Sequence, residues 1–311
     1  MSRSSTNGAT PAPEEKAERP ETALSARAVS LGYGERLVIR ELSFAVTMGQ
    51  ITALVGPNGS GKSTLLKALA RILAPSRGAV YLDGRAIQQL PAREVARRLA
   101  ILPQAPVAPE ELTVGELVEQ GRYPYTGPLR PLGEHDYAAI ARALEQTGAT
   151  AFRPRRLASL SGGERQRAWI ALALAQETPI LLLDEPTTFL DIGHQLDVLA
   201  LIRELNRTHG KTIVLVLHDL NHAARYADRM VTLRAGQIVA DGPPQEVLTE
   251  ALLAEVFGVR ARILPHPVDG VPLCLPFAIT DAPREQPPDA HTTITSAAET
   301  AEKTVGQRAG S

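Results

Sequence analysis

Residues 51–64 decide the fold: the apolar run Ile51–Val55 leads directly into Gly56-Pro57-Asn58-Gly59-Ser60-Gly61-Lys62-Ser63-Thr64. The helical run Leu65–Leu73 follows. This is the phosphate-binding pattern G-x-x-x-x-G-K-[ST] in the strand–loop–helix context that it requires. Its glycines let the backbone approach phosphate oxygens, and the N–H groups at the helix start attract an anion. We expect a nucleoside triphosphate here, with Lys62 on its outer phosphates and the Ser63 hydroxyl on Mg²⁺.

Composition narrows the class of protein. The chain has 311 residues, 33 Lys and Arg against 34 Asp and Glu, and one Cys. The net charge of −1 argues against a general nucleic-acid binder, and a single Cys excludes a disulfide framework or a Cys-based zinc site. No apolar stretch approaches the about 18 residues that cross a bilayer, and the polar start is not typical of a signal peptide. We therefore expect a soluble, cytoplasmic chain.

The hydropathy pattern predicts one folded region between two tails. Residues 1–22 and 279–311 are rich in Ser, Thr, Pro, Ala and Glu without apolar periodicity, which predicts disorder. Residues 23–278 alternate short apolar runs with helical periods, which is typical of an α/β fold with a parallel sheet. Residues from about 105 to 160 carry helical periods and no buried strand, so we expect a helical insertion there. The further expected elements are strands Ile180–Leu183 and Thr212–Leu217, a hairpin of Met230–Leu233 with Gln237–Ala240, and a helix over 194–209.

Two carboxylates end the apolar run Ile180–Leu183. A buried parallel strand delivers the side chains at its C-terminal end to the sheet edge where ligands bind. There Asp184 is expected to hold Mg²⁺, and Glu185 is the candidate general base for the attacking water. An acidic turn that caps the next helix is the alternative.

Two further polar residues are candidates for the same site. His218 follows the strand Thr212–Leu217 and could orient water at the γ-phosphate. It could also be a structural histidine, or form a metal pair with His222 four residues on, although no third ligand stands nearby. Gln104 ends Leu102-Pro103-Gln104 at the start of the helical insertion, and could coordinate Mg²⁺ or sense the γ-phosphate.

The segment Leu160-Ser161-Gly162-Gly163-Glu164 heads a helix that runs to Ala175. Ser161 is a good N-cap, and the glycines expose N–H groups to an anion. With this segment in place, residues 23–278 resemble the ATP-binding subunits of ABC transporters. Residues 160–164 match the signature, Gln104 the Q-loop, Leu190-Asp191 the D-loop and His218 the switch histidine.

That resemblance implies a P-loop NTPase (RecA-like) core with an antiparallel β subdomain and a helical insertion, as a single ABC cassette that hydrolyses ATP with Mg²⁺. Tyr33 matches the aromatic residue that stacks on adenine. Two copies would close head-to-tail, so that Ser161, Gly162 and Gly163 of one meet the ATP held by Lys62 of the other. The dimer would dock on separate permease subunits at the cytoplasmic face of the membrane, served indirectly by a substrate-binding protein. The residues implied to bind nucleotide are Tyr33, Gly56, Asn58, Gly59, Ser60, Gly61, Lys62, Ser63, Thr64, Ser161, Gly162 and Gly163.

Several stretches also resemble the iron-chelate importers within that family: Gly121–Pro124, Glu185–Ile192, His218–Asn221 with Ala223–Asp228, Val256–Val259 and His266–Leu273. This resemblance implies a ferric siderophore as cargo, with haem and cobalamin as alternatives. Three rival classes are disfavoured. Non-transport ABC proteins carry two cassettes in one chain or a long coiled-coil insertion, and neither is present, while a P-loop kinase would lack the signature at 160–164. A scaffold that no longer hydrolyses ATP is disfavoured because Lys62, Asp184, Glu185 and His218 are all intact.

Overall fold

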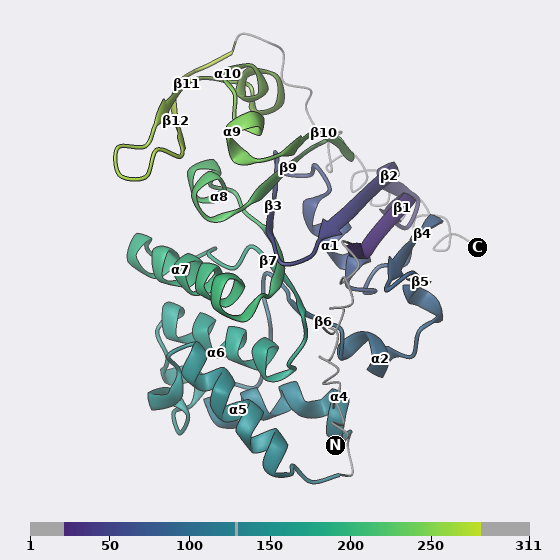
Figure 1. Ribbon diagram of the computed structural model, residues 1–311, viewed down its shortest axis with the longest axis vertical. Helices are drawn as coiled ribbons and strands as arrows, with labels where there is room; N and C mark the ends of the chain where they lie inside the picture. Colours follow the sequence, from purple (N-terminus) through teal and green to yellow (C-terminus); the bar gives the residue numbers. More distant parts are fainter. Residues whose placement is uncertain (1–21, 128–129, 281–311) are drawn as a thin grey trace, which may run out of the picture.

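The computed structural model describes residues 22–127 and 130–280, and within them a sheet of six strands forms the centre of the fold. Its order is β10-β9-β3-β8-β7-β6, and Figure 1 labels all of these strands except β8. Neighbouring strands pair in parallel except β10, which is antiparallel to β9. The strands are β3 (Ile51–Val55), β6 (Leu99–Leu102), β7 (Ile180–Asp184), β8 (Thr212–Val216), β9 (Arg229–Arg234) and β10 (Gln237–Gly242).

The central strands consist mainly of apolar residues because each faces two hydrophobic cores. In β3, Ala53 packs into the core on one face and Leu54 into the core on the other. In β7, Leu181 and Leu182 divide in the same way. Every residue of β3, β7 and β8 is buried. The predicted parallel α/β core is confirmed.

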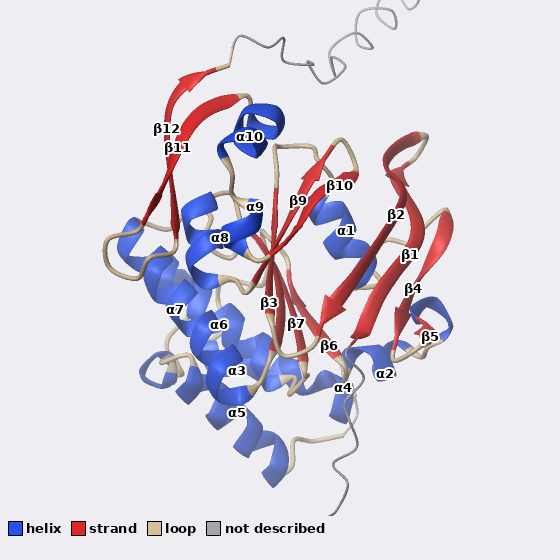
Figure 2. Ribbon diagram, turned by 45° about the horizontal axis from the view of Figure 1, so that its top comes forward, coloured by secondary structure: helices blue, strands red, loops and turns tan. Residues whose placement is uncertain are grey.

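A second, antiparallel sheet covers one face of the first. Its order is β2-β1-β4-β5, and helix α1 lies between the two sheets, with Leu65, Leu66 and Leu69 in their shared core (Figure 2). This sheet is the antiparallel β subdomain that the resemblance implied. Its elements are β1 (Thr22–Tyr33), β2 (Arg36–Thr47), β4 (Arg77–Leu82) and β5 (Arg85–Ala86), with α1 (Lys62–Leu69) and α2 (Ala92–Ala96) beside them.

Helices cover the opposite face of the central sheet (Figure 2). Between β6 and β7 the chain holds no strand longer than the single bridge Thr113–Arg156 among the described residues, as predicted for the helical insertion. The helices on this side are α3 (Val114–Glu119), α5 (Glu134–Gln146), α6 (Gly162–Ala175), α7 (Ile192–His209) and α8 (Leu220–Tyr226). Helix α4 (Tyr123–Thr126) lies beside α2, whose Arg93 donates to the Pro124 carbonyl (Figure 2). The chain continues through α9 (Pro244–Val247) and α10 (Glu250–Leu252) to the hairpin of β11 (Val259–Pro265) and β12 (Pro272–Ile279).

Some predicted boundaries are wrong. The helix expected over Leu65–Leu73 begins at Lys62 and ends at Leu69, because Arg71 takes a φ of 63° and the N–H of Ile72 closes back on the carbonyl of Lys67 at 2.8 Å. Both tail boundaries are off by one residue, since β1 starts at Thr22 and Ile279 pairs with Val259 at the end of β12. The rest of both predicted tails, apart from residue 280, lies outside the described residues.

A fully buried arginine fixes the helical insertion to the core. The Arg122 side chain is 1% exposed, and its guanidinium pairs with Asp136 of α5 at 2.9 Å and with Glu177, after α6, at 2.7 Å. It also donates to the carbonyl of Ala175 at 2.7 Å, and Tyr125 lies over it at 4.1 Å. Hydrogen bonds from Gly133 and Arg122 lower the pKa of the Asp136 carboxyl, although burial opposes them.

Arg122→Ala is expected to destabilise the protein by about 3–5 kcal/mol, because it leaves the Asp136 carboxylate buried without its partner. The measurement is urea unfolding followed by circular dichroism. Arg142→Ala is the matched control: Arg142 pairs with the same Glu177 at 2.6 Å but is half exposed, so its loss should cost less than about 1 kcal/mol. Equal losses in the two variants would contradict the role of Arg122.

Candidate active site

One pocket of about 770 Å³ gathers most of the residues that the motifs predicted. The phosphate loop and the start of α1 form its floor, Tyr33 stands at the end of β1, and Glu185 and His218 come from the C-terminal ends of β7 and β8. Parallel neighbours bring these strand ends together at one sheet edge. Its lining is Tyr33, Arg36, Leu37, Val38, Arg40, Asn58, Gly59, Gly61, Lys62, Ser63, Thr64, Glu185, His218 and Ala235.

Lys62 is held inside the loop that it belongs to. Its side chain is 5% exposed, and Nζ donates to the carbonyls of Gly56 and Pro57, at 2.9 Å each. Burial lowers the pKa of Lys62, while the charges of Glu185 and Asp184 oppose this shift. Two carbonyls of the loop thus fix the position of the ammonium group, which is shielded from water and lies within the loop that is expected to hold the phosphates.

Gly56 and Ser60 do not line the pocket, although both were predicted to bind nucleotide. Gly56 has a φ of 143°, and a Cβ there would lie 2.1 Å from the carbonyl oxygen of Leu233 in β9. Glycine at this position therefore lets the loop pass against the neighbouring strand. The Ser60 hydroxyl is buried and has no hydrogen-bond partner among the described residues.

The residues predicted to hold magnesium suit that ion. Ser63 Oγ donates to Asp184 Oδ1 at 2.8 Å, so the hydroxyl at the start of α1 and the carboxylate at the end of β7 meet. Burial raises the pKa of Asp184, and the hydrogen bond from Ser63 opposes the rise. A hydroxyl and a carboxylate oxygen are ligands that Mg²⁺ prefers, and they lie beside the loop expected to hold phosphates. The donor set therefore fits Mg²⁺ carried by ATP.

Glu185 is the centre of a hydrogen-bonded group. Gln104 Nε2 donates to Glu185 Oε2 at 2.5 Å, and Thr188 Oγ1 donates to the same oxygen at 3.0 Å. His218 Nε2 lies 2.6 Å from Glu185 Oε1. The backbone of Glu185 has a φ of 51°, a conformation that non-glycine residues adopt mostly where the surroundings hold them in it. The structure thus brings together the three residues predicted to be catalytic, Gln104, Glu185 and His218.

The two histidines of the possible metal pair have different surroundings. His218 faces Glu185, whereas the ring of His222 packs edge-on against Tyr226 with 6.5 Å between the ring centres. Across residues 22–127 and 130–280 there is no group of three His, Cys, Asp or Glu arranged to hold a metal ion. The geometry therefore favours a partnership of His218 with Glu185.

The predicted signature residues lie away from this pocket. Ser161 caps α6, its hydroxyl accepting from the Glu164 N–H at 3.3 Å, while Glu164 Oε2 accepts from the Ser161 N–H at 2.9 Å. The pocket lining does not include Ser161, Gly162 or Gly163. These residues stand at the start of α6, in the helical layer on the face of the central sheet that lies opposite the antiparallel sheet. Within one chain the two segments that are predicted to bind anions therefore stay separate.

Motifs alone missed several residues of the site. Arg36, Leu37, Val38 and Arg40 line the pocket from β2 but belong to none of the motifs. An alternating pattern does not pick them out, because four of the five residues 36–40 line the pocket. Thr188, which contacts Glu185, belongs to none of the motifs either.

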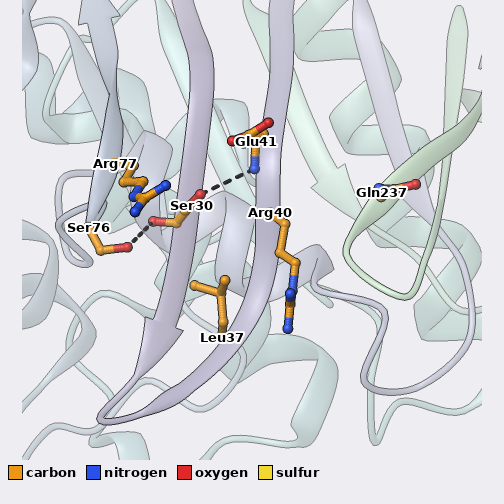
Figure 3. A pocket seen from close by; sticks show the side chains of 7 residues that line it. All are labelled: Ser30, Leu37, Arg40, Glu41, Ser76, Arg77 and Gln237. Atoms are coloured by element: carbon orange, nitrogen blue, oxygen red, sulfur yellow. Dashed lines mark hydrogen bonds between the residues drawn. The ribbon is translucent and has the colours of Figure 1, made fainter.

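A second hollow, of about 660 Å³, lies beside the pocket on the antiparallel sheet, and the two share Leu37 and Arg40 (Figure 3). The Glu41 N–H donates to Ser30 Oγ at 3.2 Å, and Ser76 Oγ donates to the Ser30 carbonyl at 3.1 Å. These bonds fasten β1 to its two neighbouring strands. None of the residues predicted to be catalytic or to bind metal lines this hollow.

The phosphate loop, the Asp-Glu pair at a strand end and a separate Ser-capped glycine pair on a helical layer define an ATPase cassette of the ABC type. The chain belongs to the ABC transporter family, whose profile matches residues 39–188. It is 51% identical to the achromobactin transport ATP-binding protein of Dickeya dadantii over 86% of this chain and 97% of that protein. It is 47% identical to the hemin import ATP-binding protein of Nocardia farcinica over 78% of this chain and 83% of that protein.

Among solved structures, the fold is similar to a dimeric ATP-binding cassette in a post-hydrolysis state with bound ADP and Pi. The TM-score is 0.62 at 29% identity, over 71% of this chain and 98% of that one. The predicted family, fold class and ATPase activity are confirmed by these comparisons.

Proposed function

We propose that this chain is the ATPase subunit of an importer for iron chelates, with a ferric siderophore as the cargo. The 51% identity to an achromobactin transport protein across 97% of its length supports this cargo. Haem is the alternative, supported by the lower identity of 47% to a hemin import protein. The catalytic pocket carries no cargo information, because its residues serve ATP.

In the working unit, two copies close head-to-tail around ATP. The separation of Ser161 and Gly163 from the pocket of their own chain supports this arrangement, and so does the dimeric state of the similar cassette. Gln104, Ser63 and Asp184 would hold Mg²⁺, which neutralises charge on the phosphates when it is bound. Lys62 binds and orients the phosphates, and Glu185 accepts a proton from the attacking water.

The cassette works on a permease made of other chains, through its helical insertion. Among the described residues, no helix has the length and apolar character needed to span a bilayer. The exposed tyrosines Tyr123 and Tyr137 on the insertion offer a surface of the kind enriched at interfaces. The chain would sit as a peripheral subunit on the cytoplasmic side, and a substrate-binding protein would deliver the chelate.

The test of the cargo is uptake of radiolabelled iron by cells that lack this chain. Uptake from ferric enterobactin or a ferric hydroxamate should be lost, then restored by the wild-type chain and not by Glu185→Gln. Loss confined to hemin would move the assignment to the haem alternative. Unchanged uptake from every one of these chelates would overturn the proposed function.

Lys62→Ala is expected to weaken ATP binding about 100-fold, because a charge-assisted contact to phosphate is worth up to about 3 kcal/mol. The measurement is titration with a fluorescent ATP analogue. Lys67→Ala is the control, since it removes the same charge from the same helix at a residue outside the pocket lining. Undiminished affinity in Lys62→Ala would contradict the assignment of the loop.

A further inference from the structure

The two glycines of the signature lie close against other side chains, Gly163 most closely, and neither uses the backbone freedom of glycine. Gly162 and Gly163 occupy the first turn of α6, and neither has a positive φ. A Cβ on Gly163 would lie 2.0 Å from Cδ2 of His194, and one on Gly162 would lie 3.3 Å from Cδ2 of Leu190. Both neighbours belong to the segment that follows Glu185, so the signature and that segment pack directly on one another.

His194 is fixed on its other side by Asp191. Its Nδ1 lies 2.8 Å from Asp191 Oδ2, and its backbone N–H donates to Asp191 Oδ1 at 2.9 Å, which caps α7. These hydrogen bonds lower the pKa of the Asp191 carboxyl. The imidazole is therefore a spacer of defined position between Asp191 and the Cα of Gly163.

Further contacts hold the segment between Glu185 and His194 in place. Thr188 Oγ1 donates to Glu185 Oε2 at 3.0 Å, and Gln195 Nε2 donates to the Leu190 carbonyl at 3.0 Å. Arg167 of α6 also faces Asp197 of α7 at 3.5 Å. The backbone of residues 185–194, fixed by these contacts, thus joins the general base of a subunit to its own signature.

We propose that His194 is a positioning residue that couples the segment after Glu185 to the signature of the same subunit. It sets where Ser161 and Gly163 stand when they meet ATP on the partner copy, so it acts on turnover and not on binding of ATP by one subunit. This inference rests on the proposed head-to-tail function. Its rival is a purely structural role, in which His194 only completes the cap of α7.

His194→Ala is expected to lower the ATPase kcat about tenfold while the affinity of a single subunit for a fluorescent ATP analogue stays within about twofold, because misplaced groups cost turnover first. His194→Asn separates the two roles. Its amide nitrogen takes the place of Nδ1 and keeps the bond to Asp191, but the face of Gly163 is left open. A positioning role predicts low kcat with a wild-type melting temperature, whereas wild-type kcat in His194→Asn would overturn the proposal.

Two controls make the result specific. His209→Ala removes a histidine from the other end of α7, where it contacts Gln146, and should keep the wild-type kcat. In a Glu185→Gln background, ATP-dependent dimer formation is compared for His194→Ala and Ser161→Arg by size-exclusion chromatography. If Ser161→Arg still dimerises, the proposed head-to-tail function and this inference both fall. The other outcome concerns His194 alone. It is that Ser161→Arg blocks the dimer, whereas His194→Ala forms the dimer and, with Glu185 intact, hydrolyses ATP at the wild-type rate. In that case only the inference about His194 falls.

Discussion

Glu185→Gln is expected to lower the ATPase kcat by about 1,000-fold while ATP still binds, because general-base catalysis contributes 10²–10⁴ in rate. The amide keeps the shape of the side chain and can still contact Gln104 and Thr188, so the pocket should remain assembled. What it loses is the ability to take a proton from water. ATP should then persist in the closed dimer, and the dimer should become long-lived.

The measurements are phosphate release at saturating ATP and size-exclusion chromatography with and without ATP. Glu204→Gln on the exposed side of α7 makes the same chemical change outside the site and should keep the wild-type rate. Turnover near the wild-type level in Glu185→Gln would remove Glu185 from the role of general base. Slow turnover without a stable ATP-bound dimer would agree with Glu185 as the general base, but it would contradict the proposal that two copies close around ATP.

The two carboxylate oxygens of Glu185 are engaged by Gln104, Thr188 and His218. In its proposed role as general base, Glu185 must offer one of these oxygens to the water that attacks the γ-phosphate. We therefore expect a contact from Gln104 or His218 to be exchanged for water when ATP binds, which links the helical insertion to the chemistry.

The parts of the fold and site that the sequence predicted are those whose signal is local. The run Ile51–Val55 predicts its strand to the residue because both of its faces are buried. The phosphate loop and the Asp184-Glu185 pair are contiguous in the chain, so spacing alone is enough to find them. The end of α1 was mispredicted because apolar residues continue past the point where Arg71 turns the backbone.

Contacts between distant segments gave no such signal. Arg122 reads as a surface residue in a Gly- and Pro-rich stretch, yet it is buried because Asp136 and Glu177 come to it from other elements. His194 lies on a predicted amphipathic helix, and only the packing of α6 on α7 brings it against Gly163. The burial of a charged side chain and the close approach of a backbone both depend on tertiary structure. They cannot be predicted from the pattern of neighbouring residues in the sequence.

Ser161→Arg is expected to lower kcat at least about 100-fold without changing the affinity of one subunit for ATP. Ser161 is exposed at the start of α6 and does not line the pocket of its own chain, so a large cation there leaves that pocket intact. In the head-to-tail dimer the same side chain would stand where the partner's phosphates must come, and a bulky arginine in place of a small cap would keep the subunits apart. Misplacement of about 1 Å alone can cost 100-fold in rate.

Loss of the helix cap is the competing explanation, and Ser161→Ala separates it from blocked closure. Both variants lose the hydroxyl that accepts from Glu164, which costs about 1 kcal/mol, but only arginine adds bulk at the interface. Ser161→Ala should therefore share the small drop in melting temperature and retain much of the activity and the ATP-dependent dimer. Normal hydrolysis by Ser161→Arg would show that Ser161 serves no partner site. Equal loss of ATP-dependent dimer formation in the two variants would show that the added bulk is not what keeps the subunits apart.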